Sequence, residues 1–99
     1  MKIEEKVYKK LLQVPSGKIT TYGELSRLVG LKNGQRIIGH IMKKNPFPVI
    51  VPCHRVVKSD GNVGGYAYGT AIKKNMLTRE GLKINNNKIL DFKNNLFQF

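Results

Sequence analysis

Proline and glycine divide this chain into short segments. Pro15-Ser16-Gly17, Gly30 and Asn45-Pro46-Phe47-Pro48 each end a helical pattern, because proline removes a backbone donor and glycine favours the left-handed conformation found after helix ends. A length of 99 residues supports one small hydrophobic core. We therefore expect a single domain of short helices and extended connections, and we exclude a two-domain enzyme.

Apolar residues recur at helical spacing in the two segments before Gly30. Residues 3–14 predict one helix. Thr20 or Thr21 can cap a second helix that ends before Gly30. The residues expected to face the core are Ile3, Val7, Leu11 and Val14 in the first helix and Tyr22, Leu25, Leu28 and Val29 in the second.

A third helix is predicted from Gln35 to Lys44, after a turn at Asn33-Gly34. Its core-facing residues should be Ile37, Ile38 and Ile41, and its opposite face is basic. Two short helices joined by a tight turn, the second one basic, have the outline of a helix-turn-helix. Many such pairs are purely structural, so this pattern alone leaves DNA binding open.

The charge favours a polyanionic partner. Lysine and arginine number 18 against 6 acidic residues, a formal net charge of +12. Nucleic acid is the leading candidate, because neutralised phosphates release counterions; a lysine-rich surface that only confers solubility is the alternative. Apolar runs are too short to cross a bilayer, and the first residues carry acids where a signal peptide is apolar. We expect a cytoplasmic protein without a membrane partner, associated with the nucleoid in a prokaryote.

Extended segments and loops dominate the middle of the chain. Val49–Val51 is expected to be a buried extended segment that leads to Cys53, and Val56-Val57 continues as an extended stretch. The glycines at Gly64-Gly65 let the backbone approach a ligand closely.

The end of the chain contains one more predicted helix and a tail. The helix spans Ala71–Arg79, with Thr70 as its cap and Gly81 after its end. Its core-facing residues should be Ile72, Met76 and Leu77. We assign residues 1–84 to the functional domain and residues 85–99 to a tail that either docks, as a strand or a helix, or frays.

The only cysteine, Cys53, is followed by His54. A lone cysteine excludes an internal disulfide and a multi-thiolate zinc site, and no common metal spacing links it to the histidines, so we expect no metal. A cysteine beside a histidine is a candidate nucleophile and base, which needs an acid to orient the imidazole. The alternative is a buried, inert thiol. The acids available are Glu4, Glu5, Glu24, Asp60, Glu80 and Asp91.

Several motifs occur in order along most of the chain, from about Val7 to Leu82. They are Asn45-Pro46, Pro52-Cys53-His54-Arg55-Val56-Val57, Gly61-Asn62-Val63-Gly64-Gly65-Tyr66 and Glu80-Gly81. Together they resemble the O6-alkylguanine-DNA alkyltransferases, the methylated-DNA–protein-cysteine methyltransferases. The resemblance implies a mainly α fold with short extended segments: a helix-turn-helix, winged-helix-like, DNA-binding alkyltransferase domain.

By this resemblance, the chain repairs DNA by taking the alkyl group of O6-alkylguanine permanently onto Cys53, so that each molecule turns over once. His54 would activate the thiol through a bridging water, and Glu80 would orient the histidine. Asn45 would hold the turn that carries Cys53. Tyr22 would help to rotate the nucleotide and would donate a proton toward the guanine.

The resemblance also implies how DNA is bound. The target nucleotide leaves the stack, Arg36 fills the gap, and the third helix lies in the minor groove. Arg55 would form an internal ion pair, and bulky Tyr68 would narrow the pocket, so that methyl transfers well and benzyl poorly. DNA contacts are assigned to Arg36, Tyr22, Gly39, Lys43 and Thr21, and the substrate pocket to Tyr66, Ala67, Val56 and Pro52.

No cofactor is implied, and we expect a monomer that acts on double-stranded DNA containing O6-alkylguanine. The competing interpretation is an alkyltransferase-like module that binds lesions without transferring the alkyl group. Such proteins keep the fold but replace the cysteine, so Cys53 argues against this interpretation. A general basic DNA-binding domain, with no preference for alkylated DNA, is a third.

Overall fold

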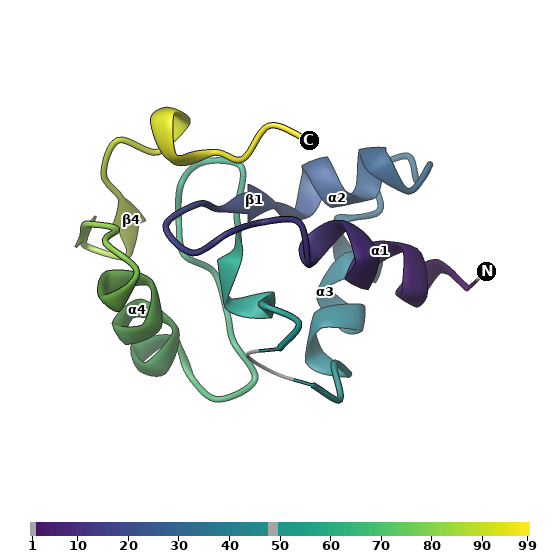
Figure 1. The fold of residues 1–99 in the computed structure, drawn as a ribbon, viewed down its shortest axis with the longest axis horizontal. Coiled ribbons are helices and arrows are strands. Elements are labelled where there is room, and N and C mark those ends of the chain that lie inside the picture. The colour runs from purple at the N-terminus through teal and green to yellow at the C-terminus, as the bar shows by residue number, and fades with distance from the viewer. Residues whose placement is uncertain (1, 48–49) are drawn as a thin grey trace.

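The computed structural model describes residues 2–47 and 50–99. Val49, the first residue of the segment expected to be buried and extended, lies outside these ranges with Pro48, and the expectation is wrong for Ile50, which is 73% exposed in a turn. Helices dominate, as predicted, with two small sheets in the described chain (Figure 1). None of the described helices is long and apolar enough to cross a membrane. The elements are α1 (Ile3–Leu11), β1 (Thr20–Thr21), α2 (Tyr22–Leu28), α3 (Gln35–Lys43), η1 (Cys53–Arg55), β2 (Val56–Val57), α4 (Thr70–Arg79), β3 (Ile84–Asn85), β4 (Lys88–Ile89) and η2 (Lys93–Asn95).

Helices α2 and α3 pack against each other and form the predicted helix-turn-helix. The Thr21 hydroxyl caps α2 by accepting a hydrogen bond of 3.0 Å from a first-turn amide. Gly30 follows the helix with a φ of 82°, which favours glycine. Ser26 then fixes the turn, because its hydroxyl donates to the Leu31 carbonyl (2.9 Å) and accepts from the Gly34 amide (2.8 Å). Helix α3 therefore starts from a well-anchored turn.

Two hydrophobic clusters hold the domain together. The first joins α1, α2 and α3 to the segment around Cys53, and the second joins β2 and α4 to the tail. The parallel pair β1–β2 connects them, since Val56 belongs to the first cluster and Val57 to the second. The turn that carries Cys53 immediately precedes β2, so it is attached to a strand that packs in both clusters.

The C-terminal tail packs on the body of the domain (Figure 1, yellow). The Ile19 amide donates to the Asn95 carbonyl (3.0 Å), and the Phe97 amide donates to the Ile19 carbonyl (2.8 Å). Leu96 thereby pairs in parallel with Ile19. Ile89 from the β3–β4 hairpin is buried in the second cluster. The tail is thus docked on the domain rather than frayed, and Ile89 is the residue through which it joins the core.

Three expectations about helix faces and caps are wrong. Ile37 in α3 and Ile72 in α4 are 47% and 50% exposed. In α4 the next residue, Lys73, is fully buried instead, which turns Ile72 to solvent. Gly69 precedes α4, and Thr70 forms its first turn without a side-chain capping bond. Helix α4 therefore begins after a glycine, and no side-chain hydroxyl caps its first turn.

Candidate active site and nucleic-acid interface

Cys53 begins the 3-10 turn η1 and is only 5% exposed. The segment before it is held by Asn45, whose Nδ2 donates to the Val51 carbonyl (3.0 Å) and whose Oδ1 accepts from the Phe47 amide (3.0 Å). The Cys53 amide also donates to the Val51 carbonyl (2.7 Å). Asn45 therefore contacts both ends of the loop that delivers the cysteine, the place that the resemblance implies for it.

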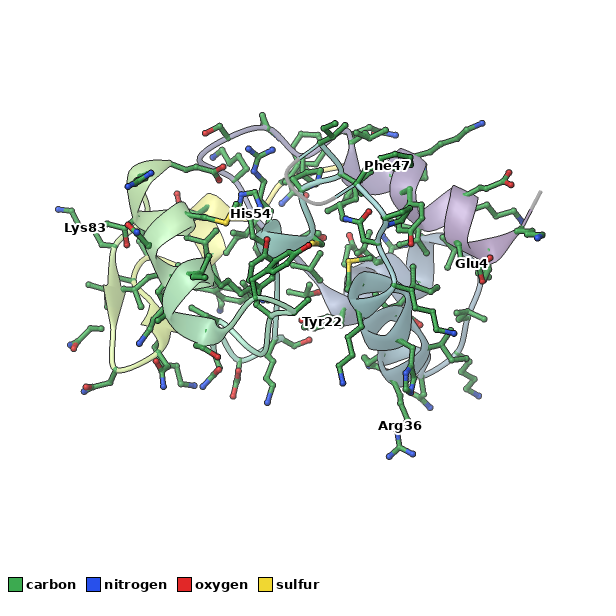
Figure 2. The ribbon with its side chains drawn as sticks, turned by 90° about the horizontal axis from the view of Figure 1, so that it is seen from below. Glu4, Tyr22, Arg36, Phe47, His54 and Lys83 are labelled. Carbon is green, nitrogen blue, oxygen red and sulfur yellow. The ribbon has the colours of Figure 1, made fainter. Side chains whose placement is uncertain are left out.

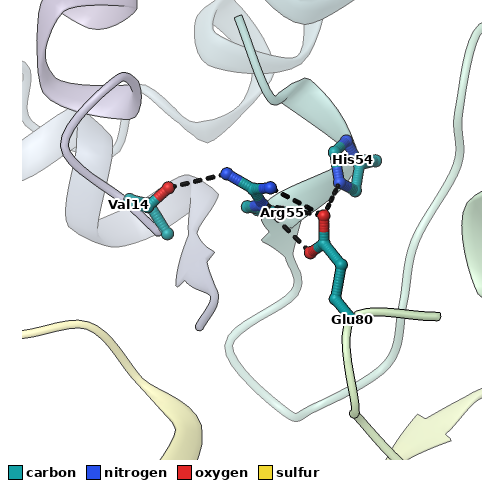
Figure 3. Close-up of polar contacts among 4 residues, drawn as sticks. All are labelled: Val14, His54, Arg55 and Glu80. Atoms are coloured by element: carbon teal, nitrogen blue, oxygen red, sulfur yellow. Dashed lines mark hydrogen bonds and ion pairs between the residues drawn. The ribbon is translucent and has the colours of Figure 1, made fainter. Parts of the chain in front are cut away.

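His54, Arg55 and Glu80 form one polar network (Figure 3). His54 Nε2 lies 2.9 Å from Glu80 Oε2. Arg55 donates to the same carboxylate from Nη2 (2.6 Å) and from Nε (3.0 and 3.2 Å), and to the Val14 carbonyl from Nη1 (2.8 Å). A carboxylate accepts, so neutral His54 carries its proton on Nε2 and leaves Nδ1 as an acceptor. Nδ1 is buried without a partner in the described chain.

The charges of this network suit a base and its orienting acid. Burial lowers the pKa of His54 and outweighs the opposing effect of Glu80, so the imidazole is neutral near pH 7. Burial would raise the pKa of Glu80, but hydrogen bonds from Arg55 and His54 hold it below its ordinary value. The network is thus a neutral base beside an ionised carboxylate. In the described ranges, no group of three or more His, Cys, Asp or Glu could hold a metal.

Cys53 lines a cavity of about 290 Å³ between α3 and the glycine-rich loop. Burial, with the negative charge of a Cys53 thiolate, raises the pKa of Tyr66 to about 12 and also raises that of Tyr22. Both phenols keep their protons at neutral pH and can donate hydrogen bonds to a ligand. The lining residues are Tyr22, Gly39, Met42, Lys43, Cys53, Gly65, Tyr66 and Ala67.

Three residues expected at the pocket do not line it, and Thr21, assigned to DNA contact, is largely buried. Val56 and Pro52 are buried and do not line the cavity; Val56 packs in the first hydrophobic cluster. Thr21 is 8% exposed, and its hydroxyl oxygen accepts a hydrogen bond from the Glu24 amide at the start of α2, which leaves its O–H as a donor. Tyr68 does not line the cavity; it packs edge-on against the lining residue Tyr66, with 5.5 Å between ring centroids.

Lys73 is a site residue whose role the sequence left open. Its Nζ donates to the carbonyls of Val56 (2.6 Å) and Gly65 (3.1 Å) and lies 5.8 Å from the ring centroid of Tyr22. Burial lowers its pKa to about 8, although a Cys53 thiolate opposes this shift. Lys73 therefore links β2 to the loop that contains Gly65, a residue that lines the cavity. The sequence contains no indication that Lys73 is buried, because the apolar pattern of this helix predicted that its neighbour Ile72 faces the core.

The exposed face of α3 is basic and adjoins the cavity. Arg36 extends away from the body of the domain (Figure 2), and His40 and Lys43 are exposed on the same helix. A groove of about 480 Å³ runs beside it, lined by Tyr22, Gln35, Arg36, Gly39, Lys58, Ser59 and Gly65. Three of these residues also line the Cys53 cavity, so groove and cavity are neighbours.

Comparisons with known proteins agree with this arrangement. The family model described as 6-O-methylguanine DNA methyltransferase, DNA binding domain, matches residues 2–82. A methylated-DNA--protein-cysteine methyltransferase of Pyrobaculum aerophilum is 48% identical over 71 residues, which cover 72% of this chain and 47% of the relative. This chain spans less than half the length of the curated relatives it matches first.

Two solved structures share the fold. Mycobacterium tuberculosis OGT in complex with DNA has a TM-score of 0.77 and 35% identity, over 81% of this chain and 50% of that one. S. pombe Atl1 in complex with damaged DNA containing O6-carboxymethylguanine has a TM-score of 0.81 and 29% identity, over 97% and 94%. Since the family model covers most of the chain, the protein belongs to the family of 6-O-methylguanine DNA methyltransferase DNA-binding domains.

Proposed function

We propose that this chain repairs duplex DNA by moving the alkyl group of O6-alkylguanine onto its own Cys53. The observation that carries the proposal is the buried Cys53 thiol, which lines a cavity beside a basic helix and precedes a histidine held by Glu80. A thioether does not return the alkyl group. The protein therefore acts as a stoichiometric methylated-DNA–protein-cysteine S-methyltransferase, with one turnover per molecule and no cofactor.

The polar network supports the proton transfers that this reaction needs. Neutral His54 takes the thiol proton at Nδ1 through a water, while its Nε2 donates to Glu80. The Cys53 sulfur attacks the alkyl carbon; the C–S bond forms, and the C–O6 bond breaks with its electron pair going to guanine. The Tyr22 phenol gives its proton to the departing guanine and regains one from His54 through solvent.

A base cannot reach a buried thiol from inside the duplex, so the nucleotide must flip out. We assign the filling of the gap to Arg36, which extends from α3 (Figure 2). Gly39 supports close approach of this helix to the minor groove, because no atom lies within 4 Å of the position that a Cβ would take. The net charge of +12 supports DNA as the partner. We expect a monomer in the cytoplasm.

A lesion-binding module without alkyl transfer is the second candidate function. Its support is the match to Atl1, which extends over 97% of this chain and so includes most of the tail. The thiol beside a histidine argues for transfer. The two functions differ in whether a covalent product forms.

Intact-protein mass spectrometry after incubation with a duplex containing one O6-methylguanine separates these functions. We expect the wild type to gain the mass of one methylene, located on the peptide with Cys53, and Cys53→Ala to gain none. A wild type that binds the lesion duplex more tightly than the unmodified one and gains no mass would be a lesion sensor. Equal binding to both duplexes without a mass change would leave a general basic DNA-binding domain.

A further inference from the structure

The wall of the Cys53 cavity carries a cation and no acid. Lys43 lines the cavity together with Gly39, and the two residues are four apart on α3, so they share a helix face. Helical side chains lean toward the N-terminus, which directs the Lys43 side chain over Gly39, where no Cβ stands in the way. None of the lining residues is an aspartate or glutamate.

A second ammonium group lies behind the opposite wall. Lys73 Nζ donates to the carbonyl of Gly65, itself a lining residue. The carboxylate of the polar network, Glu80, pairs with Arg55 and His54 and does not line the cavity. A negative group placed in this cavity would therefore adjoin Lys43, with the buried ammonium group of Lys73 behind Gly65, and would meet no acidic lining residue.

We propose that Lys43 makes the cavity selective for O6 adducts that carry a carboxylate, with O6-carboxymethylguanine as the smallest such substrate. This rests on the proposed alkyl transfer. The Cys53 sulfur attacks the methylene carbon, a C–S bond forms, and the C–O6 bond breaks with its electrons going to guanine, which receives a proton from Tyr22 while the thiol proton passes to His54. The carboxylate stays unchanged beyond the methylene. Without a cation, an approaching thiolate would be repelled by this carboxylate, and Lys43 offsets that repulsion.

The experiment compares two adducts of nearly equal size, one anionic and one neutral. Duplexes containing O6-carboxymethylguanine or O6-carbamoylmethylguanine are each mixed with excess protein, and the rate of adduct transfer is followed by peptide mass mapping of Cys53. The proteins are the wild type, Lys43→Gln and Lys44→Gln. The last is a matched control, because Lys44 is the adjacent exposed lysine and does not line the cavity.

The ratio of the two rates separates selectivity from DNA affinity. Loss of either lysine weakens binding to both duplexes alike, since both have the same phosphates. We expect Lys43→Gln to lower the carboxymethyl-to-carbamoylmethyl ratio by about three- to fivefold, the range of a partly exposed ion pair, and Lys44→Gln to leave it unchanged. Added salt should shrink the effect.

An equal ratio in wild type and Lys43→Gln would overturn the proposal, and so would an equal fall in Lys44→Gln. Transfer from O6-methylguanine is measured in the same series with all three proteins. If methyl transfer occurs and the ratio does not move, the selectivity inference fails and the proposed function stands. If the wild type transfers no methyl group, the proposed function itself fails.

Discussion

Replacing Glu80 by glutamine should destabilise the fold far more than its location at the end of α4 suggests. The carboxylate receives Arg55 and the Nε2 of His54, and the Arg55 and Glu80 side chains are only 16% and 14% exposed. Removing one partner of a buried ion pair costs about 3–5 kcal/mol, because the other charge remains uncompensated. Since this pair is partly exposed, we expect a loss at or just below the lower end of that range, about 2–3 kcal/mol.

Thermal and urea unfolding measure this loss. For a domain of this size about 1 kcal/mol corresponds to 4–8 °C, so Glu80→Gln should lower Tm by about 10–20 °C. Glu24→Gln is the matched control, because Glu24 also pairs with an arginine, but Arg27 is 69% exposed. That exposed pair should be worth about 0.3–0.5 kcal/mol. Similar losses in both variants would refute the claim that burial gives the Glu80 network its strength.

The difference in stability between the wild type and Glu80→Gln should depend on pH. The folded pKa of Glu80 lies below its ordinary value, so its contribution is complete above the unfolded pKa, about 4.3, and is lost as pH falls through the folded value. The wild type should therefore exceed Glu80→Gln in stability by a constant amount above about pH 5.5, and the gap should narrow below about pH 4. Urea unfolding midpoints of both proteins, measured across this pH range, test the prediction. A stability difference that does not change with pH would contradict an ionised Glu80 carboxylate.

Three further outcomes follow from single contacts. Gly39→Ala should raise Tm slightly, because a Cβ there meets no protein atom and alanine favours the helix, and it should weaken lesion-DNA binding at the proposed minor-groove face. Gly34→Ala should lower Tm, since its Cβ would meet side-chain atoms at 2.7–2.9 Å. Thermal melting and a gel-shift titration with the lesion duplex distinguish the two variants. Asn45→Ala should slow alkyl transfer in single-turnover assays, because it removes the hydrogen bonds of Asn45 to the Val51 carbonyl and the Phe47 amide; an unchanged rate would count against its role. Leu96→Asp should unfold the tail and expose the second cluster, seen as loss of protection of the Ile19 and Phe97 amides.

Local chemistry explains what the sequence predicted correctly. The Thr21 cap and the break at Gly30 depend on neighbouring residues and on backbone conformation, and both are found where they were expected. The helix-turn-helix follows from these two signals together with the apolar spacing on either side. Turn residues act within a few positions, so a sequence displays their effect directly.

Contacts between distant segments could not be predicted in this way. Glu80 lies 26 residues from His54, and the composition offered six acids for one role; only the family resemblance selected this one. Lys73 is buried because carbonyls from two other elements receive its ammonium group, which no helical pattern reveals. The same burial turned Ile72 outward. The docking of the tail likewise depends on pairing with Ile19, far away in the chain.

The number of lesions repaired per protein molecule distinguishes permanent transfer to Cys53 from repeated turnover. A known amount of protein is mixed with an excess of duplex containing O6-methylguanine, and the remaining lesion is quantified over time. Transfer to Cys53 predicts that repair stops when one lesion has been removed for each chain, with every chain carrying one methyl group on Cys53. Continued repair beyond that ratio, or repair by Cys53→Ala, would contradict the account.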